Sequence, residues 1–251
     1  MAHFFKTPFF TNSPTLALII KERHEAWENL ARKLAHEIKN PLTPIQLTID
    51  KLKSKYSEKI ADNEKDDFSK SLLIIGKQIK QIENLVNEFS DFARMPKPIL
   101  KDNNLVSLIK DNIKLINELD NKIIIDFKSS KSIILLNSDS EQLSRVFFNL
   151  IKNSIESIQD KKIDNVSFNG KINISIIENE EIINFTIIDN GLGFGSFDEN
   201  IKDLLNPYFT TKKNGTGLGL SIVNKILNDH NGKINFVSLE SGAKIEIIFI
   251  K

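Results

Sequence analysis

The feature that most constrains the fold is a pair of N-terminal segments in which large apolar residues recur every three or four positions. In residues 21–56 they are Trp27, Leu30, Leu34, Ile38, Leu42, Ile45, Ile49 and Leu52. In residues 66–94 they are Phe68, Leu72, Ile75, Ile79, Ile82, Val86 and Phe89. This spacing predicts two long amphipathic helices, and the unbroken four-three alternation of the second is typical of helices packed in a bundle or coiled coil.

The polar residues 57–67 predict a turn at Asp62-Asn63-Glu64, so the two helices should form an antiparallel hairpin. One hairpin cannot cover both apolar stripes, which favours a dimer in which two hairpins form a four-helix bundle. The alternative is that the hairpin packs against the rest of its own chain. The prolines at 96 and 98 end the second helix and mark the domain boundary.

We therefore expect three parts: a tail or stub over residues 1–20, the helical hairpin over 21–95, and a second domain over 96–251. The second domain mixes helices and strands, which predicts an α/β sandwich with helices on one face of a sheet. The fold class is thus α+β and multi-domain. Its predicted helices are 106–119, 140–159 and 218–229, and its predicted strands are 122–128, 132–136, 171–177, 182–188, 233–239 and 243–250.

Composition narrows the classes of function. The chain has no cysteine, which excludes disulfides and thiolate metal sites, and its net charge of +1 gives no reason to expect nucleic acid as a partner. No apolar run reaches the roughly 18–20 residues of a membrane helix. We expect a cytoplasmic location. For the full-length protein the alternative is an anchor in the inner membrane, with sensor and membrane segments outside this sequence.

The first helix carries a candidate nucleophile, His36. It lies about 200° around the helix from Leu34, so it should face solvent. A neutral imidazole nitrogen is a competent nucleophile near neutral pH, and Glu37 beside it could accept or orient the ring proton. Pro41 and Pro44 each remove a helical amide donor, which predicts a bend just after the histidine.

Residues 35–44 (Ala-His-Glu-Ile-Lys-Asn-Pro-Leu-Thr-Pro) resemble the H-box of histidine kinases of the HisKA type. The resemblance implies that His36 takes the γ-phosphate of ATP and that Glu37 acts as general base. It also implies that Asn40 helps to hydrolyse the phosphorylated response regulator. The longer segment 25–47 is similar to the NtrY-type nitrogen-regulation sensor kinases.

Two patches of the second domain suit a nucleotide. Asn149 and Asn153 share one face of a helix, and an amide oxygen is a suitable ligand for magnesium. Asp189 follows an apolar strand, where its carboxylate can accept a hydrogen bond from an adenine amino group. Gly191 and Gly193 would let the backbone approach a flat base closely.

Two further patches follow along the chain. Residues 207–213, which include Thr211 and Lys212, form a loop that could close over the nucleotide. Residues 215–220 open a helix, whose exposed amides and positive dipole end can bind phosphate. They lack the ending of a Walker A loop. The candidate binding residues in this patch are Gly215, Thr216, Gly217, Leu218 and Gly219.

In order and spacing these patches resemble the N, G1, F and G2 boxes of the ATPase fold shared by histidine kinases, type II topoisomerases, Hsp90 and MutL. The resemblance implies that Asn153 binds magnesium, that Asn149 lies near the phosphates and that Asp189 recognises adenine in a pocket shaped by the G1 glycines. It further implies that Lys212 meets the γ-phosphate and that the glycines at 215, 217 and 219 form the hinge of an ATP lid.

The expected function is that of a sensor histidine kinase core. It would use ATP and Mg²⁺ to phosphorylate His36, as a homodimer, and pass the phosphate to an aspartate on a response regulator receiver domain. Phosphatase activity toward that regulator is a further expectation. The alternatives are a chaperone- or topoisomerase-like ATPase and an ATP-binding dimer that acts only as a phosphatase or scaffold. The signal, the regulator and transfer within or between protomers do not follow from the sequence.

Overall fold

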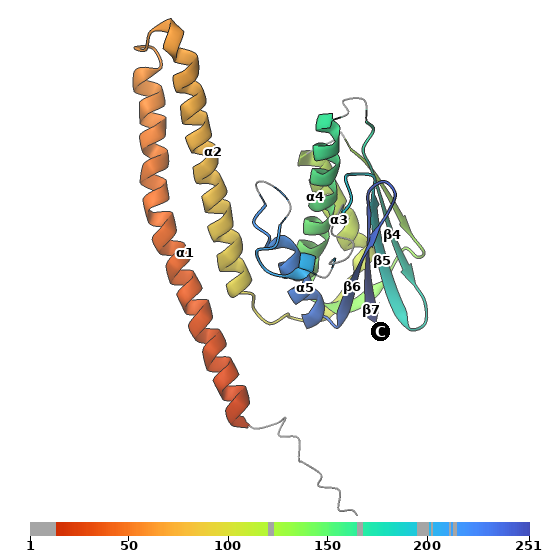
Figure 1. The fold of residues 1–251 in the computed structure, drawn as a ribbon. Helices are drawn as coiled ribbons and strands as arrows, with labels where there is room; N and C mark the ends of the chain where they lie inside the picture. The colour runs from red at the N-terminus through yellow and green to blue at the C-terminus, as the bar shows by residue number, and fades with distance from the viewer. Residues whose placement is uncertain are drawn as a thin grey trace, which may run out of the picture. The chain divides into compact units, whose positions relative to one another are not determined.

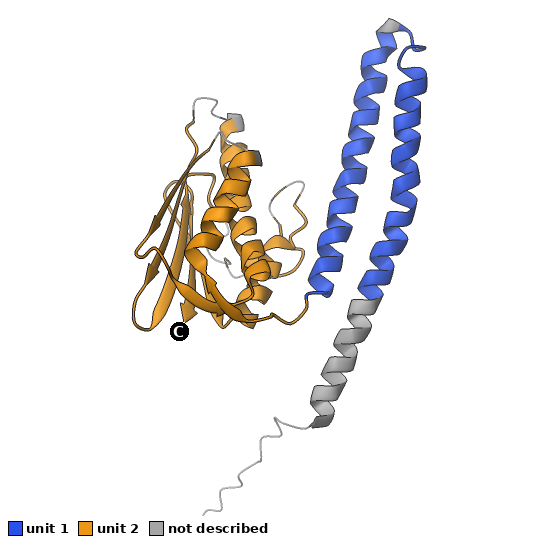
Figure 2. Cartoon of the chain, turned by 180° about the vertical axis from the view of Figure 1, so that it is seen from behind, with its two compact units in different colours: residues 1–95 blue, residues 96–251 orange. Residues whose placement is uncertain are grey.

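The computed structural model describes residues 14–119, 123–164, 168–194, 201, 203–210, 212 and 215–251, and Figure 1 shows the fold. The side chains of residues 14–29, 62, 119, 163 and 164 are not described. The chain divides into two compact units between Met95 and Pro96 (Figure 2).

The first unit is a hairpin of two long helices, α1 (Pro14–Tyr56, 43 residues) and α2 (Asp62–Ala93, 32 residues) (Figure 1). Helix α1 begins earlier than the helix predicted from about residue 21, and it continues through Pro41 and Pro44. Helix α2 also begins early, so residues 62–64, predicted as a turn, lie in its first turn. The acidic Glu64 suits that position, because carboxylates are favoured near the positive end of the helix dipole.

Packing within the hairpin uses only part of the predicted apolar stripes. The buried apolar residues include Ala31, Ala35 and Ile49 of α1 and Leu72, Ile79 and Val86 of α2. Leu42, Leu52 and Phe68 pack against the central cluster of these residues. Leu34 and Ile38, predicted as core residues, are 40% and 41% exposed, whereas Ala31 and Ala35 are buried. A second apolar stripe therefore remains uncovered in the single hairpin.

The second unit is a five-stranded sheet covered on one face by three helices (Figure 1). The strand order is β2-β4-β5-β7-β6, and all pairings are antiparallel except the parallel pair β2–β4. The helices are α3 (Leu105–Leu119), α4 (Ser140–Asp164) and α5 (Gly219–Asp229). The strands are β2 (Ile124–Ser129), β4 (Lys171–Glu178), β5 (Ile182–Asp189), β6 (Gly232–Ser238) and β7 (Ala243–Ile250).

The core lies between the sheet and α4. Alternate residues of the central strands are buried, as a sheet with one covered face requires. From the sheet they include Ile174, Ile176, Ile183, Phe185, Ile187, Ile245, Ile247 and Phe249, and from α4 they include Leu143, Phe147, Leu150, Ile151 and Ile158. The rings of Phe147 and Phe185 lie 4.9 Å apart between centroids. Each such side chain contributes about 1.5–3 kcal/mol on burial.

A two-stranded sheet lies apart from the five-stranded sheet in hydrogen bonding. It pairs β1 (Lys101–Asn104) antiparallel with β3 (Leu135–Ser138). The strand predicted at 132–136 therefore joins a strand that the sequence did not indicate, rather than the main sheet. The Asn104 Oδ1 atom accepts hydrogen bonds from the amides of Val106 (3.1 Å) and Ile134 (3.2 Å), which ties the start of α3 to β3.

Asp139 joins three distant parts of this unit at the start of α4. Its carboxylate accepts the amides of Glu141 (3.0 Å) and Gln142 (3.1 Å) at the helix start and the amide of Ile99 (2.9 Å). Its own amide donates to Nε2 of the buried His230 (2.9 Å), which follows α5. Burial alone would raise the pKa of the Asp139 carboxyl, but the backbone amides outweigh it, so the pKa lies below its usual range.

Among the helices of the described ranges, none combines the length and the apolar character needed to cross a lipid bilayer.

Candidate functional site

His36, Glu37 and Asn40 are all exposed on α1. The Glu37 carboxylate lies 4.0 Å from the Lys33 ammonium, in a solvent-exposed pair that leaves it free to rearrange. The residue before the histidine, Ala35, is buried against the hairpin, so the backbone beneath the imidazole is fixed by packing. The arrangement presents an accessible nucleophile with a carboxylate next to it.

Asp189 ends β5 and is only 5% exposed. Its Oδ1 atom accepts the amide of Gly191 at 2.9 Å, and the Ser154 hydroxyl and the Ala243 amide also donate to this carboxylate. Burial raises the pKa of Asp189 above its usual range, while these hydrogen bonds and the charge of Lys161 act in the opposite direction. The result is a buried acceptor held in one orientation at the start of the glycine loop.

The glycine loop after Asp189 packs too tightly for side chains. A Cβ atom on Gly191 would collide with Ser157, and one on Gly193 would lie 2.7 Å from the Gly242 carbonyl oxygen. Gly193 also has a φ of +75°, a conformation that disfavours other residues. The Ser157 hydroxyl accepts the amide of Leu192 at 2.9 Å, which fixes the loop against α4.

Lys161, which the sequence did not indicate, is bound to the same loop. Its ammonium donates to the carbonyl oxygens of Asn190 (2.8 Å) and Gly191 (2.9 Å) and to the Ser241 hydroxyl (2.8 Å). It lies 4.7 Å from the centroid of the Phe168 ring. A usable signal was present: polar residues at 154, 157 and 161 follow helical spacing and so lie along one side of α4.

Asn153 contacts the predicted lid lysine. The Lys212 ammonium donates to Asn153 Oδ1 at 3.0 Å and to Glu156 Oε2 at 2.5 Å. Asn149, one turn earlier, lies beside the start of α5: its Oδ1 is 4.0 Å from where a Cβ on Gly219 would stand. The structure thus brings the two asparagines, Lys212 and the start of α5 together, and it adds Glu156, which the sequence reading missed.

The second glycine cluster shapes the start of α5. Gly217 has a φ of +70° and approaches the backbone of Tyr208, whose amide donates to the Gly217 carbonyl oxygen at 3.1 Å. Leu218 is fully buried, and its amide donates to the Thr216 hydroxyl at 3.3 Å. Among the residues that the structure describes, no side chain caps α5, so its first amides could receive an anion. Gly215 approaches Thr210, whereas Thr211 lies outside the described residues.

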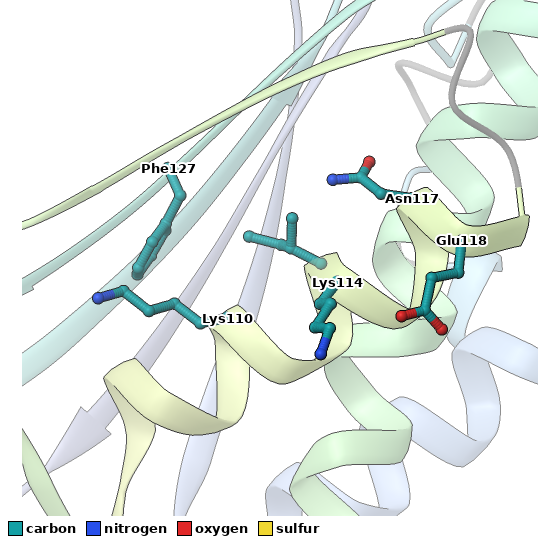
Figure 3. Close-up of a pocket in the computed structure, with 6 residues that line it drawn as sticks. Lys110, Lys114, Asn117, Glu118 and Phe127 are labelled. Atoms are coloured by element: carbon teal, nitrogen blue, oxygen red, sulfur yellow. The ribbon is translucent and has the colours of Figure 1, made fainter.

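A pocket of about 380 Å³ lies elsewhere, between α3 and β2 (Figure 3). Lys110, Lys114, Asn117 and Glu118 line it from α3 and Phe127 lines it from β2. None of the predicted site residues belongs to this pocket, so it carries no part of the predicted chemistry. Within the described ranges, no three His, Asp or Glu side chains gather as a metal site. The Asn153 side-chain oxygen stays the ligand that the sequence predicts for a hard cation.

Two family models match the chain over these two units. Residues 26–98 match the His Kinase A (phospho-acceptor) domain, and residues 138–251 match the Histidine kinase-, DNA gyrase B-, and HSP90-like ATPase. The chain belongs to the sensor histidine kinase family. The family predicted from the H-box and the four nucleotide boxes is thereby confirmed.

Known histidine kinases resemble the chain in sequence and in structure. A sensor histidine kinase described as NtrY-like from Rickettsia felis is 37% identical over 92% of this chain. The chain spans 37% of that protein's length. A crystal structure of histidine kinase ThkA in complex with response regulator protein TrrA is 25% identical, with a TM-score of 0.62, over 92% of this chain and 64% of that one. The structure of full-length ShkA with AMPPNP shares the fold, with a TM-score of 0.67 at 17% identity over 88% of this chain and 45% of that one. The predicted fold class is confirmed by these likenesses.

Proposed function

We propose that this chain is the catalytic core of a sensor histidine kinase, which transfers the γ-phosphoryl group of ATP to His36 and then to an aspartate of a response regulator. One observation carries the proposal. The chain that exposes His36 beside Glu37 also has a buried carboxylate, Asp189, before a glycine loop, where it could accept a hydrogen bond from adenine. Neither a simple ATPase nor a nucleotide-binding scaffold needs both features.

The nucleotide site would be assembled from three elements. Asp189, held by three hydrogen bonds, would accept the adenine amino group, and the close-packed glycines at 191 and 193 would admit the flat base. The uncapped start of α5 would bind phosphate oxygens through its free amides. Asn149 lies beside this helix start, where its amide can reach the same phosphates.

The site fits magnesium as well. Asn153 Oδ1 accepts a hydrogen bond from a cation, the Lys212 ammonium, which supports a role for this oxygen in binding positive charge. Bound there with phosphate oxygens and water, Mg²⁺ would neutralise charge on the triphosphate. Lys212 would then leave Asn153 and move to the γ-phosphate, as its position between the two glycine clusters allows.

At the hairpin, a ring nitrogen of neutral His36 would attack the γ-phosphorus as the bond to the ADP oxygen breaks. Glu37 would hold the proton on the other ring nitrogen and so stabilise the positive charge that develops on the imidazole. The exposed Asn40, one turn along, would orient a water for hydrolysis of the phosphorylated regulator.

The partners are a second copy of the chain and a response regulator. The uncovered stripe of the hairpin supports the dimer, because water-exposed apolar stripes on paired helices are normally buried by further helices. On α1 this stripe runs along Leu30, Leu34, Ile38 and Ile45, and His36 projects from nearly the opposite side. A second hairpin could thus cover the stripe and leave the histidine accessible to a regulator in the cytoplasm.

Labelling tests the proposal. The wild type, incubated with Mg²⁺ and γ-labelled ATP, should acquire acid-labile and base-stable label, and His36→Gln should acquire none. His24→Gln serves as the control, because it removes another histidine of the same helix and should label normally. ATP binding without any label on the wild type would contradict the kinase and favour a scaffold or phosphatase dimer.

A further inference from the structure

Lys161 stands out among the charged residues because its ammonium makes three hydrogen bonds, to the loop at residues 190–191 and to the turn at residue 241. A lysine ammonium has three N–H groups. Here they meet the carbonyl oxygens of Asn190 and Gly191 and the Ser241 hydroxyl, at 2.8–2.9 Å. With Phe168 beside it, this ammonium is tied to fixed partners rather than left in solvent. A lysine that serves only for solubility does not order itself in this way.

We propose that Lys161 is a positioning residue for adenine recognition, which acts by clamping the loop that orients the Asp189 carboxylate. The inference rests on the proposed function and extends it, because it assigns a role to a residue outside the four nucleotide boxes. Lys161 does not itself touch the base in this scheme. It acts through the loop that does.

The clamp works through a single residue, Gly191. The Gly191 carbonyl oxygen accepts from Lys161, while the Gly191 amide donates to Asp189 Oδ1. The loop is thus held from both sides of one glycine, which has no side chain of its own to fix it. Without the ammonium, the amides of Gly191 and Leu192 would keep their bonds to Asp189 and Ser157, but the carbonyl oxygens of Asn190 and Gly191 would lose their bonds to Lys161.

The clamp also ties the loop to the β6–β7 turn. Ser241 supplies the third acceptor, and the next residue, Gly242, adopts a φ of +98° where a Cβ would collide with the Asp189 carbonyl oxygen. Loop and turn therefore meet backbone against backbone. Lys161 bridges this seam, because it binds residues on both sides of it.

Charge reinforces the geometry. Two lysines of the sheet are paired with carboxylates other than Asp189. The ammonium of Lys171 on β4 lies 2.9 Å from Asp126, and that of Lys244 on β7 lies 2.6 Å from Glu246. From α4, the charge of Lys161 acts on Asp189 and lowers its pKa against the effect of burial. This matters for the base, since an ionised carboxylate is the stronger acceptor for the 6-amino group of adenine, whereas a protonated carboxyl accepts more weakly and adds a donor that the amino group does not match.

The test compares Lys161→Met with the matched control Lys162→Met, which removes the same charge from the next residue of α4. Binding of ADP without magnesium, and of adenosine by competition, would be measured by calorimetry on the full chain. We expect Lys161→Met to weaken both ligands by a similar factor of about ten, equivalent to about 1.4 kcal/mol. The loss of ADP binding on acidification should also begin at a higher pH than in the wild type. Lys162→Met should match the wild type in both respects.

Chemical rescue separates the charge from the shape of the side chain. The chain has no cysteine, so the thiol of Lys161→Cys is unique. Aminoethylation of that thiol recreates a lysine-like ammonium, and ethylation gives a neutral side chain of similar length. The aminoethylated protein should recover most of the ADP affinity, and its ADP binding should again be lost at the same acidic pH as in the wild type. The ethylated protein should recover neither property.

The inference would be overturned if Lys161→Met bound ADP with unchanged affinity and lost that binding at the same acidic pH as the wild type. A loss confined to ADP with adenosine unaffected would also overturn it, because it would make Lys161 a phosphate-binding charge. A wild-type chain that binds no ADP at all would instead overturn the proposed function, and the inference with it, so the two failures are distinguishable.

Discussion

At the scale of single residues, the contact of Lys212 with Asn153 and Glu156 joins a lid residue to the expected magnesium ligand. We expect Glu156→Gln to tighten Mg-ATP binding by about two- to fivefold, because a half-exposed ion pair that holds Lys212 away from the phosphates is worth up to about 1 kcal/mol. Equilibrium binding of a non-hydrolysable ATP analogue would measure the change.

The control for this prediction is the Lys212→Met background. Once Lys212 is gone, Glu156→Gln breaks only the exposed pair with Lys152 (3.8 Å), which does not hold Lys212 away from the phosphates, and it should leave the affinity unchanged. Weaker binding after Glu156→Gln in both backgrounds would show that Glu156 supports the nucleotide directly, which would contradict the competition for Lys212.

Asp189 makes a prediction about pH. Its pKa is raised in the folded protein, so its contribution to stability is full below the pKa of an unfolded aspartate, about 3.9, and is lost as pH rises through the folded pKa. Relative to Asp189→Asn, the nucleotide-free wild type should therefore become less stable as pH increases across that window. Urea unfolding followed by circular dichroism at several pH values would measure this change. A wild type that gains stability relative to Asp189→Asn as pH rises would contradict the assignment.

Part of the candidate site could be selected at this scale, because glycines and polar residues at strand ends, on one helix face and in a loop suit a nucleotide. Asp189 was selected from its place after an apolar strand, Asn149 and Asn153 from a shared helix face, and Lys212 from the loop between the two glycine clusters. Glu156, Ser154 and Lys161 were missed because each looks like ordinary helix surface in a linear sequence. Their importance depends on which loop lies opposite, and only the folded unit places the loop of residues 190–191 and the turn at 241 against α4.

At the scale of elements, the exposed stripe of α2 predicts the oligomeric state. Ile74, Ile75, Ile82 and Leu85 lie along one side of this helix and are exposed in the single hairpin. We expect Ile82→Asp to convert a dimer into a monomer or weaken it by more than a hundredfold, because it would bury a charge without a partner in an apolar interface. Light scattering during size-exclusion chromatography would measure the mass.

Lys77→Asp is the matched control, because it puts the same residue about 140° around α2 from Ile82. It should leave the mass of the dimer unchanged. A wild-type chain that is monomeric at all accessible concentrations would contradict the dimer itself and would require another cover for the stripe.

Elements with strong periodicity were predicted well, and the misses have physical causes. The α4 and β5 patterns placed both elements to within a few residues, because burial on one face imposes a clear period. Strand β1 reads as Lys-Asp-Asn-Asn, which carries no apolar alternation, so its pairing with β3 depends on backbone hydrogen bonds and Asn103 and Asn104 contacts alone. The parallel pairing of β2 likewise has no local signature.

At the scale of the whole molecule, the connection between the units is short and anchored on one side. The Pro96 carbonyl oxygen accepts from Gln142 Nε2 at 2.9 Å, and the Ile99 amide donates to Asp139, so the chain belongs to the second unit from Pro96 onward. Any hinge is therefore confined to the last turn of α2 and the two residues after it, Arg94 and Met95. A kinase needs such a hinge, since the nucleotide must reach and then leave the histidine.

Replacing both Pro96 and Pro98 with alanine should stiffen this connection, because α2 could then continue. We expect autophosphorylation to fall at least fivefold while ADP affinity stays the same, measured by labelling and calorimetry. Lys97→Ala, between the two prolines, should change neither quantity. An equal loss of both would contradict the hinge.

The junction at Asp139 has a consequence for the order of folding. It joins residues 40 positions apart through Ile99 and 91 positions apart through His230, and such distant contacts close late, after local helices and hairpins have formed. During synthesis, the segment after Pro98 cannot be fully secured until His230 has left the ribosome. The hairpin should thus be able to pair with a second hairpin before the Asp139 contacts of the nucleotide unit have formed. Dimer assembly would then come before catalytic competence.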